Sequence, residues 1–185
     1  PKPEAPWDTP DVRYVVPASP RTRPAGAGRP DVEVTMTVNP HHHRVPRARI
    51  DPIDSAQTAL RLLVGALHQP PEPETLVVVL DDARCGLGVI SVSGTTEPDQ
   101  VLTVVECLAR PDLVGGEAGA LIVASSRPGG DVDETDLDRW LEMCDLTEAA
   151  GLELVDWFVI GRAITCPRDL LGAPPRWRDA GARPG

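Results

Sequence analysis

The residue types that could do chemistry are concentrated in residues 119–140. Five apolar residues at 120–124 predict a buried strand, and the run SSRPGG at 125–130 predicts a sharp turn at the end of that strand. Acidic residues follow, and carboxylates favour the positive end of a helix dipole. A strand, a Gly-rich turn and a helix in this order can hold a reacting group or a ligand at the edge of a sheet, although the same order also serves simply to turn a corner.

Other catalytic arrangements are weakly represented. The serines lack a Gly-x-Ser-x-Gly elbow, and His68 is the only histidine outside the triplet at residues 41–43, so a Ser/His nucleophile lacks a base. The triplet could itself bind a metal, yet neighbouring side chains along a strand point to opposite faces, and no Cys, Asp or Glu follows at ligand spacing. We interpret the triplet as a solvated loop with adventitious metal affinity.

The four cysteines stand singly in the sequence and form no Cys-x-x-Cys pair. They are Cys85, Cys107, Cys144 and Cys166. This spacing argues against a zinc knuckle or a redox motif, so we expect all four to be small buried hydrophobic residues.

Charge is divided unevenly along the chain. Residues 1–50 hold eight Lys and Arg against five Asp and Glu, a net charge of +3, whereas residues 51–185 hold ten against twenty-three, a net charge of −13. Because phosphate binding needs a basic surface, the acidic part argues against a nucleic-acid groove. The sequence contains neither an apolar run of membrane-spanning length nor an export signal, so we expect a cytoplasmic protein.

The chain divides into four predicted segments. Residues 1–30 are rich in Pro, which cannot continue a helix or a ladder, and predict a flexible arm. Residues 31–53 predict an extra strand, because Val32, Val34, Met36 and Val38 alternate with polar residues, followed by the His-containing loop. Residues 54–177 predict the folded domain, and residues 178–185 a frayed tail.

Within residues 54–177 the patterns predict an α/β fold, a mixed β-sheet flanked by about three helices. Helices are expected from residue 54 to before Pro70, from 97 to 110, and at 135–150, the last packing Leu137, Trp140, Leu141 and Cys144 on one face. Strands are expected at 76–80, 86–94, 120–124, 153–160 and 162–166. The continuous apolar run LVVVL at 76–80 is typical of a sheet that is covered on both faces.

The segment ALIVASSRPGGDVDETDLD resembles the metal-site segment of the RadC-like branch of the JAB/MPN (JAMM) metalloprotease family, where a strand ends in His-x-His-Pro-Ser-Gly and an Asp follows about ten residues on. Residues 76–102 are similar to the paired strands, Gly-Thr turn and helix of that family. Residues 152–161 are similar to its Leu-x-Asp-His-Phe-Val-Val-Gly segment, with Trp157 in place of the His. The resemblance covers residues 54–177 and implies a JAB/MPN, cytidine-deaminase-like architecture.

In that family two His and the Asp bind zinc, and a Glu on an earlier strand acts as base. The resemblance places the two His at Ser125 and Arg127, the Asp at Asp138 and the Glu at Val89. Arg127 has no lone pair to offer, Ser125 is a poor neutral zinc ligand, and Val89 cannot accept a proton. The resemblance therefore implies a pseudoenzyme without catalytic residues, metal or cofactor, acting as a module that binds or scaffolds an unidentified protein partner.

Two alternative functions stay open. A metal-dependent JAMM-type hydrolase could use a relocated site with ligands from His41, His43 and Asp138. An accessory factor in DNA repair could work through the basic arm, by analogy with the RadC-like proteins.

The resemblance also raises the question of what replaced the metal charge. Arg127 could reach Asp138 and substitute its guanidinium for the metal ion. In the competing interpretation Arg127 points into solvent and Asp138 lies on the exposed face of an acidic helix.

Overall fold

The computed structural model describes residues 12–15, 45–110 and 116–177, and of residues 12–15 it describes only the backbone. The predicted strand at 31–38, the His triplet at 41–43 and the tail at 178–185 lie outside the described residues, as does most of the arm at 1–30. The described residues of the arm form the strand Val12–Val15 (β1). The Pro-rich composition did not predict this strand, which the β-branched and aromatic residues of VRYV favour.

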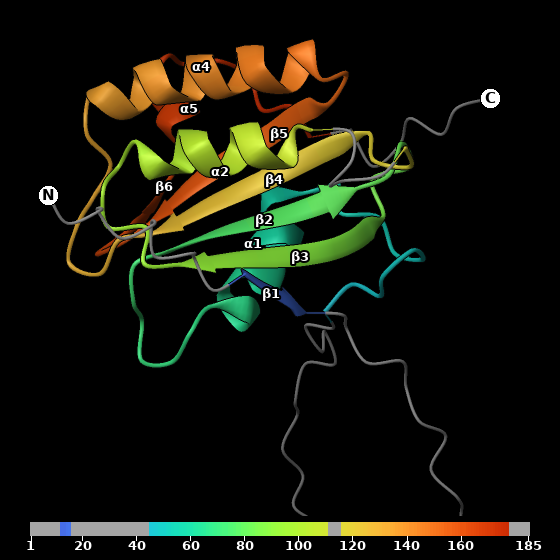
Figure 1. Cartoon of the computed structure of the whole chain (residues 1–185), viewed down its shortest axis with the longest axis horizontal. Helices are drawn as coiled ribbons and strands as arrows, with labels where there is room; N and C mark the ends of the chain where they lie inside the picture. The colour runs from blue at the N-terminus through green and yellow to red at the C-terminus, as the bar shows by residue number, and fades with distance from the viewer. Residues whose placement is uncertain (1–11, 16–44, 111–115, 178–185) are drawn as a thin grey trace, which may run out of the picture.

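The described strands form one mixed sheet in the order β1-β3-β2-β4-β5-β6 (Figure 1). After β1 they are Glu74–Leu80 (β2), Gly86–Ser93 (β3), Ala120–Ser126 (β4), Glu153–Ile160 (β5) and Ile164–Thr165 (β6). Neighbouring strands are antiparallel except for β4 and β5, which are parallel. The predicted α/β class and mixed sheet are therefore confirmed.

Four helices lie within the described residues. They are Ala56–Ala66 (α1), Gln100–Leu108 (α2), Thr135–Ala149 (α4) and the short Pro167–Leu170 (α5). The first three correspond to the predicted helices. The helix α1 begins after a polar cap, because the Ser55 side chain accepts a hydrogen bond from the Thr58 N–H at 3.3 Å. None of these four helices has the length and apolar character needed to cross a membrane.

The helices cover both faces of the sheet. Figure 1 shows α2 and α4 on one face and α1 on the other. Along β2 the side chains of Val77 and Val79 join the core under α2 and α4, while Leu76, Val78 and Leu80 join the core under α1. Every residue of β2 and β4 is buried, as the continuous apolar runs predicted.

The buried face of α4 differs from the predicted one. Its buried residues are Asp136, Trp140, Met143 and Thr147, whereas Leu141, expected in the core, is 47% exposed. Two of these buried residues are polar, and each has partners: the Thr147 hydroxyl donates to the Met143 carbonyl at 2.9 Å, and Asp136 accepts hydrogen bonds from arginine side chains. The helix is therefore rotated relative to the orientation that its apolar residues alone predict.

All four cysteines are free thiols. Cys85 is buried and Cys144 and Cys166 are partly buried, but Cys107 is exposed on α2, so the prediction of four buried cysteines is wrong for Cys107. Burial raises the pKa of the Cys166 thiol to about 12, which keeps that thiol neutral.

A buried carboxylate joins the end of α1 to the start of β2. The Glu74 side chain is fully buried and accepts hydrogen bonds from the His68 backbone N–H at 2.7 Å and the Ser91 hydroxyl at 2.8 Å. The His68 ring Nδ1 lies 2.9 Å from the same carboxylate. Nearby Glu72 is half exposed, and its carboxylate lies 3.4 Å from the same ring nitrogen. Glu72 is therefore an exposed counterpart with which the buried Glu74 can be compared.

We expect Glu74→Ala to lower the free energy of unfolding by about 2–4 kcal/mol, because the Ser91 hydroxyl and the His68 N–H lose their acceptor in a buried setting. The matched control Glu72→Ala should change it by less than about 0.5 kcal/mol. Urea unfolding followed by circular dichroism measures both values. Equal losses for the two variants would contradict a structural role for Glu74.

Candidate functional site

The candidate site lies where β4 and β5 end side by side as parallel strands. Ser125 is buried near the end of β4, and its hydroxyl accepts a hydrogen bond from the indole N–H of Trp157 on β5 at 3.0 Å. Directly after β4, the backbone N–H of Arg127 donates to the carbonyl of Ile160 at 2.8 Å and holds the turn against β5. Two positions of the predicted site, Ser125 and Arg127, therefore both lie next to Trp157.

Arg127 is committed to a carboxylate from α4. Its Nη1 donates to Asp136 Oδ2 at 2.7 Å and its Nη2 donates to Asp136 Oδ1 at 2.8 Å. The Arg127 guanidinium carbon also lies 5.6 Å from the centroid of the Trp157 ring, within the range of a cation–π contact. With 15% of the Arg127 side chain exposed and none of the Asp136 side chain, this is a nearly buried bidentate ion pair.

A second arginine completes the pair into a network. Arg139 Nη1 donates to Asp136 Oδ1 at 3.0 Å, and Arg139 Nε donates to Asp99 Oδ1 at 2.7 Å, next to the start of α2. Burial lowers the pKa of Arg139, but its hydrogen bonds to Asp99 and Asp136 outweigh burial and raise the pKa overall. The three side chains of Arg127, Asp136 and Arg139 form an arginine–aspartate network.

The start of α4 fixes this network in place. Asp133 precedes the helix, and its carboxylate accepts hydrogen bonds from the Thr135 N–H at 2.8 Å and the Asp136 N–H at 3.1 Å. The hydrogen bond from the Thr135 hydroxyl is the main reason why the pKa of Asp133 is lowered. The Asp133 N–H in turn donates to Asp136 Oδ2 at 2.9 Å. The first turn of α4 thus holds Asp136 in a single orientation toward Arg127.

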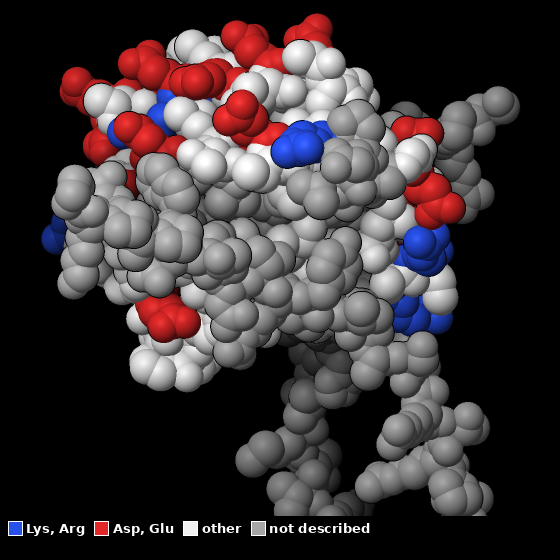
Figure 2. Space-filling view, in the orientation of Figure 1, with Lys and Arg blue, Asp and Glu red and all other residues white. Residues whose placement is uncertain are grey.

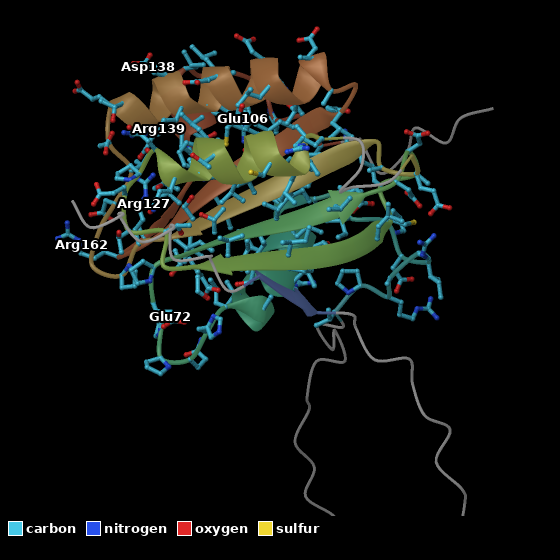
Figure 3. All side chains as sticks on the ribbon, viewed as in Figure 1. Glu72, Glu106, Arg127, Asp138, Arg139 and Arg162 are labelled. Carbon is cyan, nitrogen blue, oxygen red and sulfur yellow. The ribbon has the colours of Figure 1, made fainter. Side chains whose placement is uncertain are left out.

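The predicted partner of Arg127 was wrong. Asp138 is exposed on α4, and Figure 3 shows it on the outer side of the helix, away from Arg127. Two residues correspond to about 200° around a helix, so Asp136 and Asp138 point in nearly opposite directions. The Arg127 guanidinium faces Asp136 instead. Of the competing interpretation, the exposed position of Asp138 is confirmed, and the solvent-facing Arg127 is wrong.

Val89, the fourth position of the predicted site, lies on the other face of the sheet. Val89 pairs with Val78 of β2 and packs in the core under α1. Ser125 pairs with Thr75 of β2, three residues away along the strand, and contacts Trp157 in the core under α2 and α4. A Glu at position 89 would therefore face α1, because alternate residues of a strand face opposite sides.

The structure thus brings together Ser125 and Arg127 but neither Val89 nor Asp138. Among the described residues, no three His, Cys, Asp or Glu side chains are arranged to hold a metal ion. Each of the two carboxylate oxygens of Asp136 accepts two hydrogen bonds, and the buried Ser125 hydroxyl accepts a hydrogen bond from the Trp157 indole. In this arrangement the charges of Arg127, Asp136 and Arg139 neutralise one another. The arrangement presents neither an activated nucleophile nor a free base.

Sequence reasoning missed Asp136 and Arg139. The available signal was the motif Asp133-x-Thr135, which is typical of a helix N-terminus and places Asp136 in the first turn. From that start, positions 136, 140, 143 and 147 follow one face at spacings of three and four residues. The apolar residues suggested a different face, so the polar members of the buried stripe were overlooked.

Comparison of the chain with protein-family models gives no match, and a search of curated proteins gives none either. The RadC-like resemblance is therefore a hypothesis that depends on the sequence pattern alone.

We expect Arg127→Ala to lower the free energy of unfolding by about 2–3 kcal/mol, because the buried Asp136 carboxylate loses two charge-assisted hydrogen bonds but keeps Arg139. Asp138→Ala should change it by less than about 0.5 kcal/mol. A double-mutant cycle should give a coupling energy of at least about 1 kcal/mol between Arg127 and Asp136, and none between Arg127 and Asp138. Coupling to Asp138 instead would contradict the bidentate geometry of the ion pair.

Proposed function

We propose that this chain is a catalytically inactive RadC-like JAB domain that acts as a protein-binding or scaffolding module in the cytoplasm. The observation that carries the proposal is the ion pair between Arg127 and Asp136. In the family the second metal-binding His would occupy the position of Arg127. Here a permanent cation takes that position and is neutralised by a buried carboxylate, which leaves no role for a bound zinc ion.

The neighbouring residues support the same proposal. Zinc hydrolysis needs three ligands with lone pairs, an open water position and a base. At the aligned positions this chain has the Ser125 hydroxyl, which accepts a hydrogen bond from the Trp157 indole, and Val89, which cannot act as a base. Substitution at several positions of one site supports loss of catalysis more strongly than substitution at one.

The charge of the surface supports a protein partner over a nucleic acid. Figure 2 shows acidic side chains gathered over α4. The exposed charged residues of this helix are Asp138, Glu142, Asp145 and Glu148, and the exposed Glu134 directly precedes it. A surface of this sign repels phosphate groups, so the described part of the chain does not favour the DNA-repair alternative.

We expect the purified full-length protein to hold less than about 0.1 zinc ion per chain after chelation, zinc reconstitution and desalting. Elemental analysis by mass spectrometry measures this value. The matched variant His41→Ala/His43→Ala tests the relocated site, because tight zinc binding that disappears in this variant would favour the hydrolase. About one zinc ion per chain in both proteins would contradict the pseudoenzyme hypothesis and would show that the zinc site does not use His41 or His43.

A further inference from the structure

The outer edge of β5 is covered by a short strand at one end and by an irregular segment near the rest. β5 pairs with β4 along one side, but on its other side β6 pairs only with Val159 and Ile160. Near the rest of that edge lies a segment without secondary structure, the C-terminal strap, which comprises residues 173–177 (APPRW). The Ala173 carbonyl accepts a hydrogen bond from Arg168 Nη1 of α5 at 2.9 Å, which fixes the beginning of the strap.

Arg176 holds the strap to one face of the sheet. Its Nη1 donates to the backbone carbonyl of Leu154 at 3.1 Å, at the start of β5. Its guanidinium carbon lies 5.5 Å from the centroid of the Trp140 ring, which belongs to the core under α2 and α4. A backbone acceptor and an aromatic ring together form a seat for a guanidinium.

Trp177 holds the strap to the opposite face. Its indole N–H donates to Asp156 Oδ2 at 3.2 Å, and its ring stacks on Phe158 with centroids 6.3 Å apart. Both rings belong to the core under α1. Adjacent residues of the strap therefore contact opposite faces of the sheet, as do the side chains of an extended peptide bound at a sheet edge.

The Asp156 carboxylate, which binds Trp177, does not need the strap to neutralise its charge. Asp156 is fully buried and also accepts hydrogen bonds from Arg168 Nε at 3.3 Å and Arg168 Nη2 at 3.0 Å. The backbone N–H of Trp157 donates to the same carboxylate at 3.1 Å. When Trp177 leaves, the carboxylate keeps its arginine, so no buried charge is left unpaired. Release of the strap uncovers an aromatic ring and a hydrogen-bond acceptor that are already in position.

The seat of Arg176 opens into a cavity with an acidic wall. The cavity has a volume of about 340 Å³ and is lined by Cys144, Thr147, Glu148, Gly151 and Arg176 among others. Glu148 is exposed, so its carboxylate is available to a cation that enters the cavity. Charge therefore favours an arginine at this end of the edge, as the strap itself provides.

We propose that the outer edge of β5 is a recognition site for an extended segment of a partner protein in which arginine is directly followed by tryptophan. The C-terminal strap occupies this site in cis and competes with the partner. This proposal rests on the protein-binding function proposed above, and it adds the kind of partner segment that would bind. Because the strap is tethered, its effective concentration is on the order of millimolar or higher, so a partner segment binds the intact chain weakly.

The test uses a fluorophore-labelled peptide APPRW and the full-length chain, with binding measured by fluorescence anisotropy. The variant Arg176→Ala/Trp177→Ala vacates the site and should bind the peptide at least about tenfold more tightly than the unaltered chain. The matched variant Arg162→Ala removes an exposed arginine outside the strap and should bind the peptide as the unaltered chain does. The peptide APPAA should bind none of the three.

Failure of the double variant to bind APPRW, with its melting transition retained, would overturn the proposal, as would equal binding of APPAA. Should the double variant not fold, Trp177→Phe keeps a ring on Phe158 but loses the hydrogen bond to Asp156, and it should bind APPRW more tightly than the unaltered chain. No gain in that variant would also overturn the proposal. The zinc content is measured separately, so loss of the pseudoenzyme hypothesis and loss of the recognition site are distinguishable.

Discussion

Burial of β2 and β4 on both faces is the constraint on which the rest of the structure depends. Because each central strand contributes alternate side chains to two cores, both faces need helices, and α1 lies on one while α2 and α4 lie on the other. The same alternation decides which side chains can meet. It places Ser125 and Trp157 together and directs Val89 away from them.

Much of the fold could be predicted from the sequence because its two central strands contain continuous apolar runs. The runs at 76–80 and 120–124 and the mostly apolar stretch at 153–160 each correspond to an observed strand, and the polar cap at Ser55 marks the start of α1. The rotation of α4 could not be predicted in this way, because the helix buries Asp136 and Thr147 in exchange for hydrogen-bond partners that include a residue of another element. Apolar periodicity contains no information about such partners.

The candidate site shows the same division. The resemblance suggested Asp138 as the partner of Arg127 and left open a solvent-facing arginine, whereas Arg127 binds Asp136. Which carboxylate it binds depends on where the helix begins and how it is rotated, and an error of two residues exchanges a buried ion pair for a solvated one. The outer edge of β5 had no local signal, because the contacts of Arg176 and Trp177 are with residues distant in sequence, among them Leu154, Asp156, Phe158 and Trp140.

The positions of three tryptophans make them intrinsic fluorescence probes of different parts of the structure. Trp157 is fully buried beside Arg127, whereas Trp177 lies in the strap and Trp140 lies beneath Arg176. Indole emission shifts to longer wavelength as the ring enters water, and a nearby guanidinium alters it further. The emission of the chain sums over four tryptophans, and release of the strap changes the surroundings of Trp177 and Trp140 but leaves Trp157 buried in the core.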